Sequence, residues 1–275
     1  MTGFVKCGRG ISAATARAPS RVLPMLVLLV PALFMSGCFA PRFKPPGDSI
    51  PAVDASRVCS EAQSHHAPVA SMRALVDATV SRSDESVSFR YVIVGRGKDR
   101  FRIDMLPFEG AFTLGILVVR DGQTLLLDAQ EKTFSKASKE AELLETFLGL
   151  EGITREVIVG LVTGVLPSID CSSMRAYRGR DGTLSMVDRS SQVVWHVNPH
   201  TFAVNGIEIL DRDGRRVQVS GERTPAPRTG LSTVYLSIFK PLEARVEMLV
   251  KKLSIDPPLA DSLFAVAVPP SYTER

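Results

Sequence analysis

The chain has 275 residues and a formal net charge of +4, from 33 Lys and Arg against 29 Asp and Glu. Four of the basic residues and none of the acidic ones precede Cys38, so the part from Cys38 onward is balanced, with 33 − 4 = 29 basic against 29 acidic residues. A neutral chain without a basic cluster has no electrostatic footprint for nucleic acid. We therefore exclude nucleic acid as a partner.

The first 37 residues have the layout of an export signal. An uncharged apolar stretch, residues 22–35, follows four basic residues, Lys6, Arg9, Arg17 and Arg21. The stretch is shorter than the ~20 apolar residues that a membrane-spanning helix needs. It also contains two prolines. The pattern therefore predicts a signal that is removed after export.

The signal ends in Met35-Ser36-Gly37-Cys38, which resembles a lipobox, the site where a peptidase cuts before an acylated cysteine. Met35 stands in the place of the usual leucine. We expect a lipoprotein signal peptide over residues 1–37, an acylated Cys38, and a proline-rich flexible tether over residues 38–49. The alternative is an ordinary signal peptide with an incidental cysteine. Phe39, rather than aspartate, follows the cysteine, which by the sorting rule of enteric lipoproteins implies a lipid anchor in the outer membrane, on its periplasmic face.

Removal of the signal leaves 275 − 37 = 238 residues, enough for one sizeable core. Residues 50–275 are therefore expected to form a single domain. Cys7 is lost with the signal and Cys38 is consumed by lipid, so Cys59 and Cys171 remain in an oxidising compartment. There, a disulfide between the two is the simplest outcome. Two unrelated buried thiols are the alternative.

Alternation of apolar and polar residues predicts strands through most of the domain. Tight turns such as Asp121-Gly122 join consecutive strands, which is typical of an antiparallel meander. The first group of expected strands covers residues 72–81, 87–93, 101–105, 111–120 and 123–129. The second group covers residues 174–180, 183–188, 192–197, 202–210, 216–222, 231–239 and 242–253.

Three helices interrupt this pattern. A short one is expected within residues 50–66, and an amphipathic one over residues 138–149, with Ser138 as its cap and Gly149 at its end. Another begins at Thr154 and ends before Pro167. The predicted fold class is mainly β, with some α: an unclosed antiparallel β-barrel, or strongly curved sheet, of about eleven strands whose concave face the helices cover.

Three stretches of the sequence resemble the family of lipoprotein-localisation proteins that includes the periplasmic carrier LolA, its outer-membrane receptor LolB and LolB-like lipoproteins. The first stretch is a strand, a loop with Pro107 and Gly110, and two further strands over residues 101–128. The second is the helical insertion, which ends in Leu-Val-Thr-Gly-Val-Leu-Pro at residues 161–167. The third is the C-terminal stretch, residues 250–269. Together the matches extend over roughly residues 70–270.

This resemblance implies an apolar cavity that binds acyl chains of lipoproteins or lipids and delivers them to the membrane, without a cofactor. A periplasmic LolA-like carrier is an implied partner. The apolar strand faces and helix stripe give the expected acyl-chain contacts: Phe89, Tyr91, Phe101, Ile103, Met105, Leu144 and Phe147. A solid core without a cavity is the alternative. A structural lipoprotein of an envelope complex, with the same fold but no lipid transfer, is the alternative function.

The resemblance also singles out Phe108, in the loop between two expected strands, because the receptor member of the family carries an exposed leucine in a protruding loop at this place. There it serves membrane delivery. Pro107 fixes φ and interrupts the ladder, and Gly110 permits a tight return. The competing interpretation is that Phe108 folds back as a plug under the barrel rim.

Catalytic and metal sites are not expected. His196 and His200 are separated by Asn198-Pro199, which prevents the helix that would put both rings on one face. Residues 84–85 form an acidic pair that fits a solvated turn better than a catalytic pair. The sequence contains no nucleophile elbow, no phosphate loop and no His-Glu-x-x-His motif, so we do not expect an enzyme.

Overall fold

The computed structural model describes residues 43–45, 47–50, 52–83, 85–110, 112–137, 139–180, 182–188, 190, 192–214, 216–225, 232–239 and 243–275. These belong to one compact unit, Ala40–Arg275. The predicted signal peptide, Cys38 and Phe39 lie outside the described residues. None of the described helices is long and apolar enough to span a membrane.

The described strands form one 15-stranded sheet, in the order β1-β8-β9-β10-β11-β12-β13-β14-β2-β3-β4-β5-β6-β7-β15. Neighbours are antiparallel except β15 and β7, which are parallel. The strands are β1 (Asp48–Ser49), β2 (Ser71–Arg82), β3 (Glu85–Arg96), β4 (Arg100–Pro107), β5 (Gly115–Arg120), β6 (Gln123–Asp128), β7 (Thr133–Ala137), β8 (Met174–Arg178), β9 (Leu184–Asp188), β10 (Val193–Val197), β11 (Val204–Leu210), β12 (Val217–Pro225), β13 (Ser232–Ile238), β14 (Ala244–Ile255) and β15 (Thr273–Glu274).

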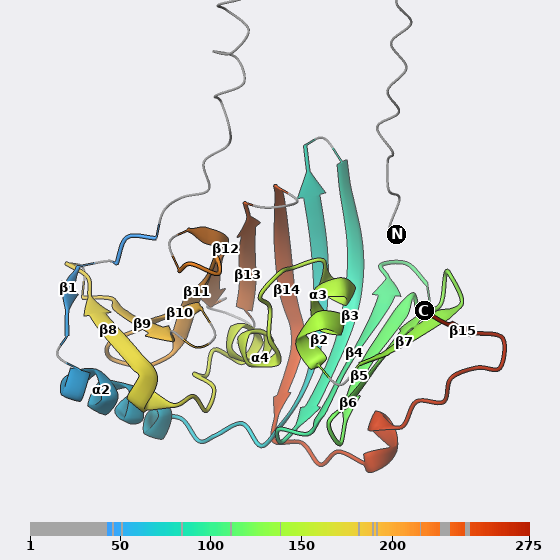
Figure 1. Ribbon diagram of the computed structural model, residues 1–275, viewed down its shortest axis with the longest axis horizontal. Coiled ribbons are helices and arrows are strands. Elements are labelled where there is room, and N and C mark those ends of the chain that lie inside the picture. The colour runs from blue at the N-terminus through green and yellow to red at the C-terminus, as the bar shows by residue number, and fades with distance from the viewer. Residues whose placement is uncertain are drawn as a thin grey trace, which may run out of the picture. The chain divides into compact units, whose positions relative to one another are not determined.

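The sheet is curved and unclosed (Figure 1), so the predicted fold class is confirmed. The expected number of about eleven strands is too low: the described sheet has 15, three more than the twelve ranges in which strands were expected. Two of the extra strands, β1 and β15, have two residues each, too few to show any alternation. The third, β7, is a five-residue strand that the sequence pattern did not mark. The strand expected over residues 111–120 begins only at Gly115, because the loop after β4 is longer than the pattern indicated.

The described helices are α2 (Ala52–His65), α3 (Glu140–Leu148) and α4 (Arg155–Thr163). The first turn of α4 is capped by Thr154, whose Oγ1 accepts a hydrogen bond from the Val157 amide at 3.3 Å. Lys139, without a side-chain cap, precedes α3, and the expected cap Ser138 lies outside the described residues. Both α3 and α4 lie in front of the sheet, on the concave face that we call the inner face (Figure 1).

The main core lies between the inner face and the helices. Its largest fully buried side chains include Trp195 and Phe101. Two smaller clusters cover the outer face. In one, Phe43 packs near Val187, Val194, Leu210 and Val217. In the other, Phe264, from the short 3-10 helix η2 (Asp261–Phe264), is buried with Val94 and Val118.

The N-terminal segment is attached to the edge of the sheet. Asp48 and Ser49, the last residues of the predicted tether, pair with Arg178 and Tyr177 of β8. A disulfide joins Cys59 of α2 to Cys171 of the 3-10 helix η1 (Cys171–Ser173), with Cα atoms 5.6 Å apart. The bond ties α2 to the segment that follows α4.

Candidate functional site

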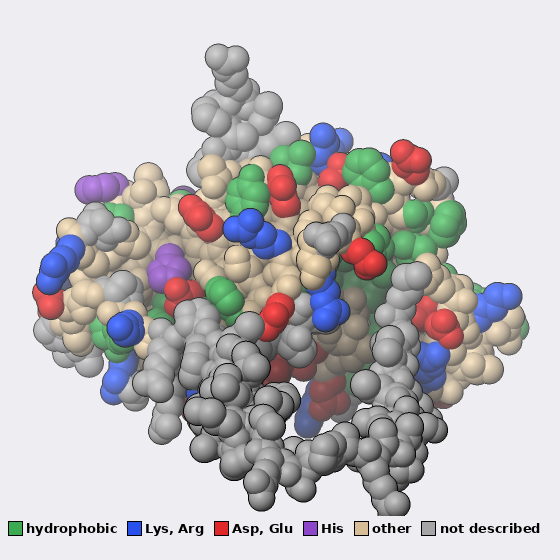
Figure 2. Space-filling view, turned by 90° about the horizontal axis from the view of Figure 1, so that it is seen from above, with side chains coloured by type: hydrophobic (Ala, Val, Ile, Leu, Met, Phe, Trp, Pro, Cys, Tyr) green, Lys and Arg blue, Asp and Glu red, His purple; other side chains and the backbone are tan. Residues whose placement is uncertain are grey.

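The inner face of β3 passes gradually from closed core to open surface. Alternate residues of a strand share one face. Along this face Ile93 is 6% exposed, Tyr91 and Phe89 are partly buried, and Val87, near the turn to β2, is 53% exposed. The apolar surface therefore continues beyond the core toward the upper end of the sheet in Figure 1. In the view from above, hydrophobic side chains gather on the right of the visible face (Figure 2).

The neighbouring strands extend this surface sideways. Met248 of β14 pairs with Ala78 of β2, and Ala78 pairs with Phe89 of β3. Met248 and Val246 are partly buried and pack against the main core. The upper inner face is thus apolar across at least three adjacent strands.

One side of this surface is bounded by α3. Its Phe147 packs over β5 at Gly115, where an added Cβ would lie 3.0 Å from Phe147 Cε2 and 3.7 Å from Met105 Cε. Leu144, one turn earlier, is fully buried. A glycine at position 115 therefore makes room for an aromatic ring that is itself only partly covered.

The structure divides the seven predicted acyl-chain contacts into two groups. Phe101, Ile103 and Leu144 are at most 1% exposed and belong to the closed core. The other four are partly buried on or beside the open part of the inner face: Phe89, Tyr91, Met105 and Phe147. Burial raises the pKa of Tyr91 to about 12, because the apolar surroundings disfavour the charged phenolate.

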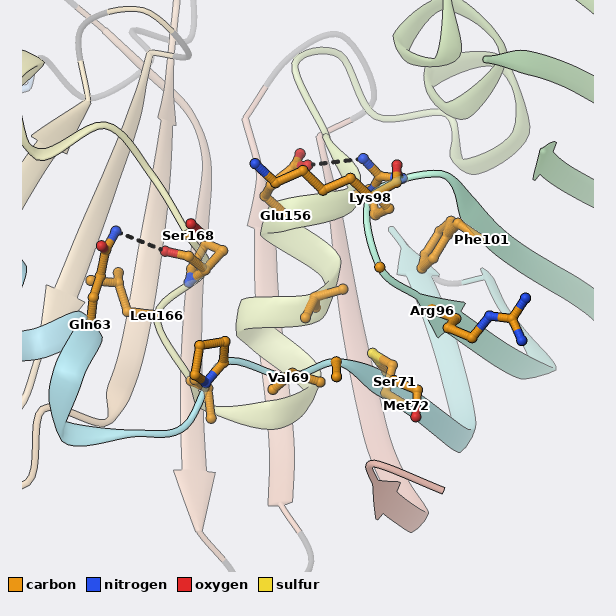
Figure 3. Close-up of a pocket in the computed structure, with 18 residues that line it drawn as sticks. Gln63, Val69, Ser71, Met72, Arg96, Lys98, Phe101, Glu156, Leu166 and Ser168 are labelled. Carbon is orange, nitrogen blue, oxygen red and sulfur yellow. Dashed lines mark hydrogen bonds and ion pairs between the residues drawn. The ribbon is translucent and has the colours of Figure 1, made fainter. Parts of the chain in front are cut away.

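A pocket of about 360 Å³ lies at the opposite, lower end of the sheet, where the start of β2 and the end of β3 face α4 and the loop after it. Val69, Met72, Phe101 and Leu166 contribute to its walls (Figure 3). The volume is at the lower end of the range for small-molecule sites, ~300–1,000 Å³. This pocket is predominantly apolar and is built from segments far apart in the sequence.

Polar contacts frame the pocket. Gln63 points toward the loop after α4 (Figure 3) and its Nε2 donates a hydrogen bond to the Ile169 carbonyl at 2.8 Å. Lys98 and Glu156 lie together at one end, whereas Arg96 points away (Figure 3), and it donates to the Leu259 carbonyl at 2.8 Å.

Arg155 of α4 connects three elements beside the pocket. Its guanidinium donates a hydrogen bond to the Lys98 carbonyl in the β3–β4 turn and lies 3.8 Å from Glu140 Oε2 of α3. Burial raises the pKa of Glu140, although the positive charge of Arg155 acts in the opposite direction. The two helices of the insertion are thereby attached to each other and to the sheet.

The loop after β4 presents two exposed aromatic rings. Phe108 is 46% exposed and Phe112 is 62% exposed. The Arg90 guanidinium lies 5.5 Å from the centroid of the Phe108 ring. Phe108 therefore lies at the surface and is not folded back under the rim. Phe112 was missed by the sequence reasoning, although a second aromatic residue in the same short loop was a visible signal.

Within the described residues, no group of three His, Cys, Asp or Glu side chains is placed to hold a metal ion. A Ser-His-Glu row on the outer face was not anticipated: Ser185 Oγ is 3.0 Å from His196 Nδ1, and His196 Nε2 is 3.5 Å from Glu208 Oε1. Its formation depends on the register of β9, β10 and β11. Ser185 has no exposed surface, so no substrate reaches its hydroxyl in this conformation.

No family model and no curated protein matches the sequence of this chain. Solved structures do resemble the fold. They include a DUF1329 family protein from Desulfovibrio piger, with a TM-score of 0.56 and 12% identity over 78% of this chain and 97% of the other. A putative outer membrane lipoprotein-sorting protein domain from Vibrio parahaemolyticus is similar with a TM-score of 0.55 and 12% identity, again over 78% of this chain and 97% of the other.

A LolA superfamily protein from Nitrosomonas europaea is also similar, with a TM-score of 0.51 and 14% identity over 77% of this chain and 97% of the other. Identities this low carry information on the fold alone. The likeness extends over more than three quarters of this chain and nearly the whole of each of these solved structures. The chain therefore has a LolA-like fold.

Proposed function

We propose that this protein is a LolB-like lipoprotein, anchored through acylated Cys38 to the periplasmic face of the outer membrane, that binds acyl chains and delivers them to the membrane. Its ligands are the acyl chains of lipoproteins or of other lipids, and the donor is a periplasmic LolA-like carrier. The proposed activity is non-covalent and uses no cofactor or enzymatic step. The fold shared with a lipoprotein-sorting domain supports this proposal.

The observation that carries the proposal is the graded inner face. Burial decreases from Ile93 through Tyr91 and Phe89 to Val87, so a continuous apolar surface leads from the core to the open end of the sheet. An acyl chain laid on such a surface gains about 0.8 kcal/mol for each CH₂ group removed from water. Met105 and Met248 supply unbranched side chains that adapt to chains of different shape.

Lipid that accompanies the purified protein tests the proposal. The Cys38→Ser chain lacks the thiol that would be acylated, so it can be isolated from the periplasm without detergent. We expect mass spectrometry of its organic extract to identify acylated molecules in amounts comparable with the protein. Addition of a LolA-like carrier loaded with an acylated lipoprotein should transfer that cargo to this chain.

A substitution on the inner face tests whether the lipid binds there. Phe89→Asn in the Cys38→Ser chain should reduce the bound lipid, because it places an amide on the apolar path. Ser88→Asn is the matched control, since Ser88 is the preceding residue and faces the other side of β3. Absence of lipid and of cargo transfer in a folded Cys38→Ser chain would favour a structural lipoprotein of an envelope complex instead.

A further inference from the structure

Arg223 occupies an unexpected place on the inner face. The sheet register pairs Arg223 of β12 with Val234, Val234 with Met248, Met248 with Ala78, and Ala78 with Phe89. These five residues form one cross-strand row, which we call the Arg223 row. Neighbouring strands lie ~4.8 Å apart, so Arg223 and Phe89 are about 19 Å apart along the curved sheet. A cation thus stands at one end of an otherwise apolar row, in which Val234 and Ala78 are buried and Met248 and Phe89 are only partly buried.

The guanidinium of Arg223 lacks a counter-charge in the described part of the chain. It forms no ion pair there, and its Nε is buried without a hydrogen-bond partner. Burial lowers the pKa of Arg223, and no carboxylate acts against this effect. A partly buried cation without a partner is costly, so its retention in an apolar surface calls for an explanation.

The side chain is held in place by close packing against the end of α4. A Cβ added to Gly164, the left-handed residue that ends this helix, would lie 2.5 Å from Arg223 Nη1 and 2.7 Å from Cζ. The negative end of the helix dipole accounts for part of the attraction. It amounts to about half an elementary charge, so the cation is positioned but not neutralised.

We propose that Arg223 binds the phosphate of an anionic phospholipid whose acyl chain lies over Met248 and Phe89, the partly buried apolar residues of the Arg223 row. The inference rests on the proposed binding of acyl chains to the inner face and narrows the cargo. A guanidinium matches a phosphate through two parallel hydrogen bonds, which a neutral head group cannot accept with the same strength. The fully acylated cysteine of a mature lipoprotein carries no charge at its amine, and it would leave Arg223 unpaired.

Two lipids with the same acyl chain test this inference. Lysophosphatidylglycerol carries a phosphate, whereas monoacylglycerol is neutral. Each lipid is titrated into the Cys38→Ser chain in the presence of the neutral fluorescent probe N-phenyl-1-naphthylamine, and the displacement curves give the two dissociation constants. We expect lysophosphatidylglycerol to bind about tenfold more tightly, as a charge-assisted contact of moderate strength implies.

Variants of Arg223 test whether this residue causes the preference for lysophosphatidylglycerol. Arg223→Gln should abolish the preference while leaving monoacylglycerol binding within about twofold. Arg223→Lys should keep part of it, because the charge remains but the paired geometry is lost. Lys98→Gln, which removes a cation beside the lower pocket, is the matched control and should keep the full preference.

The outcomes separate this inference from the proposed function. Equal affinities for the two lipids in the unsubstituted chain would overturn the role of Arg223 and leave acyl-chain binding intact. Failure of both lipids to displace the probe would contradict the proposed function itself. If Arg223→Gln lowers the melting temperature and weakens both lipids equally, Arg223 only caps α4. Should that variant not fold, the unsubstituted chain and Arg223→Lys still decide the question.

Discussion

Gly160 of α4 lies directly against the indole of Trp195 in β10. A Cβ on Gly160 would stand 2.6 Å from Trp195 Cζ3 and 3.1 Å from Cη2. This contact sets how closely α4 approaches the inner face. It also explains why a glycine is kept within a nine-residue helix, where it costs helix stability.

We expect Gly160→Ala to destabilise the domain by about 1–2 kcal/mol, because overpacking in a closed core exceeds the gain of about 1 kcal/mol in helix propensity. Trp195→Phe should relieve the clash in the double variant. The indole Nε1 has no hydrogen-bond partner in the structure, so this exchange breaks none. Urea unfolding of both single variants and the double variant gives the coupling free energy. Strict additivity would contradict the energetic coupling that this contact predicts.

We expect the disulfide between Cys59 and Cys171 to stabilise the folded state strongly. Cys59 and Cys171 are 112 residues apart, and closing a loop of that length contributes about 4–5 kcal/mol in the chain-entropy model. Cys59→Ser with Cys171→Ser should therefore lower the free energy of unfolding by up to this amount. Thermal unfolding with and without reductant measures the effect, and peptide mapping under non-reducing conditions checks the bond. Two free thiols in the mapped protein would refute the bond.

The exposure of Phe108 predicts a functional effect without a loss of stability. Phe108→Glu should change the free energy of unfolding by no more than about 0.5 kcal/mol, since surface substitutions are usually tolerated. It should nevertheless reduce transfer of acylated cargo to liposomes, because a carboxylate does not enter the hydrocarbon region.

Phe108→Leu is the control for this experiment, since it keeps an apolar tip. Phe112→Glu should behave like Phe108→Glu, as Phe112 is 62% exposed in the same loop. Undiminished transfer by a stable double variant, with Glu at both positions, would show that the loop is an ordinary connection.

The environment of Asp261 predicts that the stability of the folded state depends on pH. Hydrogen bonds from Arg100 and Arg96 lower the pKa of Asp261 to about 2, from an ordinary value of 3.8. The folded state therefore binds this proton less tightly than the unfolded state. The stabilisation is complete above about pH 4 and is lost as the pH falls toward about 2.

Asp261→Asn should remove this part of the acid sensitivity, which thermal unfolding between pH 2 and 5 measures. Hydrogen exchange should show the effect first around η2, where Phe264 is buried against the outer face. An unchanged pH profile in the variant would mean that Asp261 does not control the attachment of η2.

The anchor proposed at Cys38 predicts a change of fractionation. Cys38→Ser should release the chain into the soluble periplasmic fraction and abolish labelling with a radioactive fatty acid, because the thiol is the acceptor of the first acyl group. An Ala variant of Ser36 serves as a control, since it keeps the small residue of the lipobox. Labelling and membrane association that survive Cys38→Ser would exclude this residue as the anchor.

The alternation of side chains was sufficient to predict most strands. The expected strands over residues 72–81 and 87–93 became β2 and β3, which extend over Ser71–Arg82 and Glu85–Arg96. Helix α4 was also predictable, because Thr154 marks its start and Pro167 limits its end. Each of these signals is local, so each can be read without knowing which strands are neighbours.

The cationic end of the inner face was not predictable in the same way. Alternation places Gly221 and Arg223 on one face of β12, but it does not say that this face is the inner one. Nor does it give the level of Phe89 relative to Arg223, which depends on the register of four successive strand pairs. Such register follows from packing across the whole sheet, which is a long-range property.

The two outermost strands of the sheet, β1 and β15, have only two residues each. An unclosed sheet has two free edges, and a long exposed edge offers unpaired amide and carbonyl groups to any extended chain nearby. Here the segments near the two ends of the described chain each occupy one edge. An incoming strand from a partly unfolded neighbour therefore finds part of each edge already paired, at Tyr177 and Arg178 of β8 and at Thr133 and Phe134 of β7. The open sheet is in this way partly protected from growing into a larger sheet with copies of the same chain.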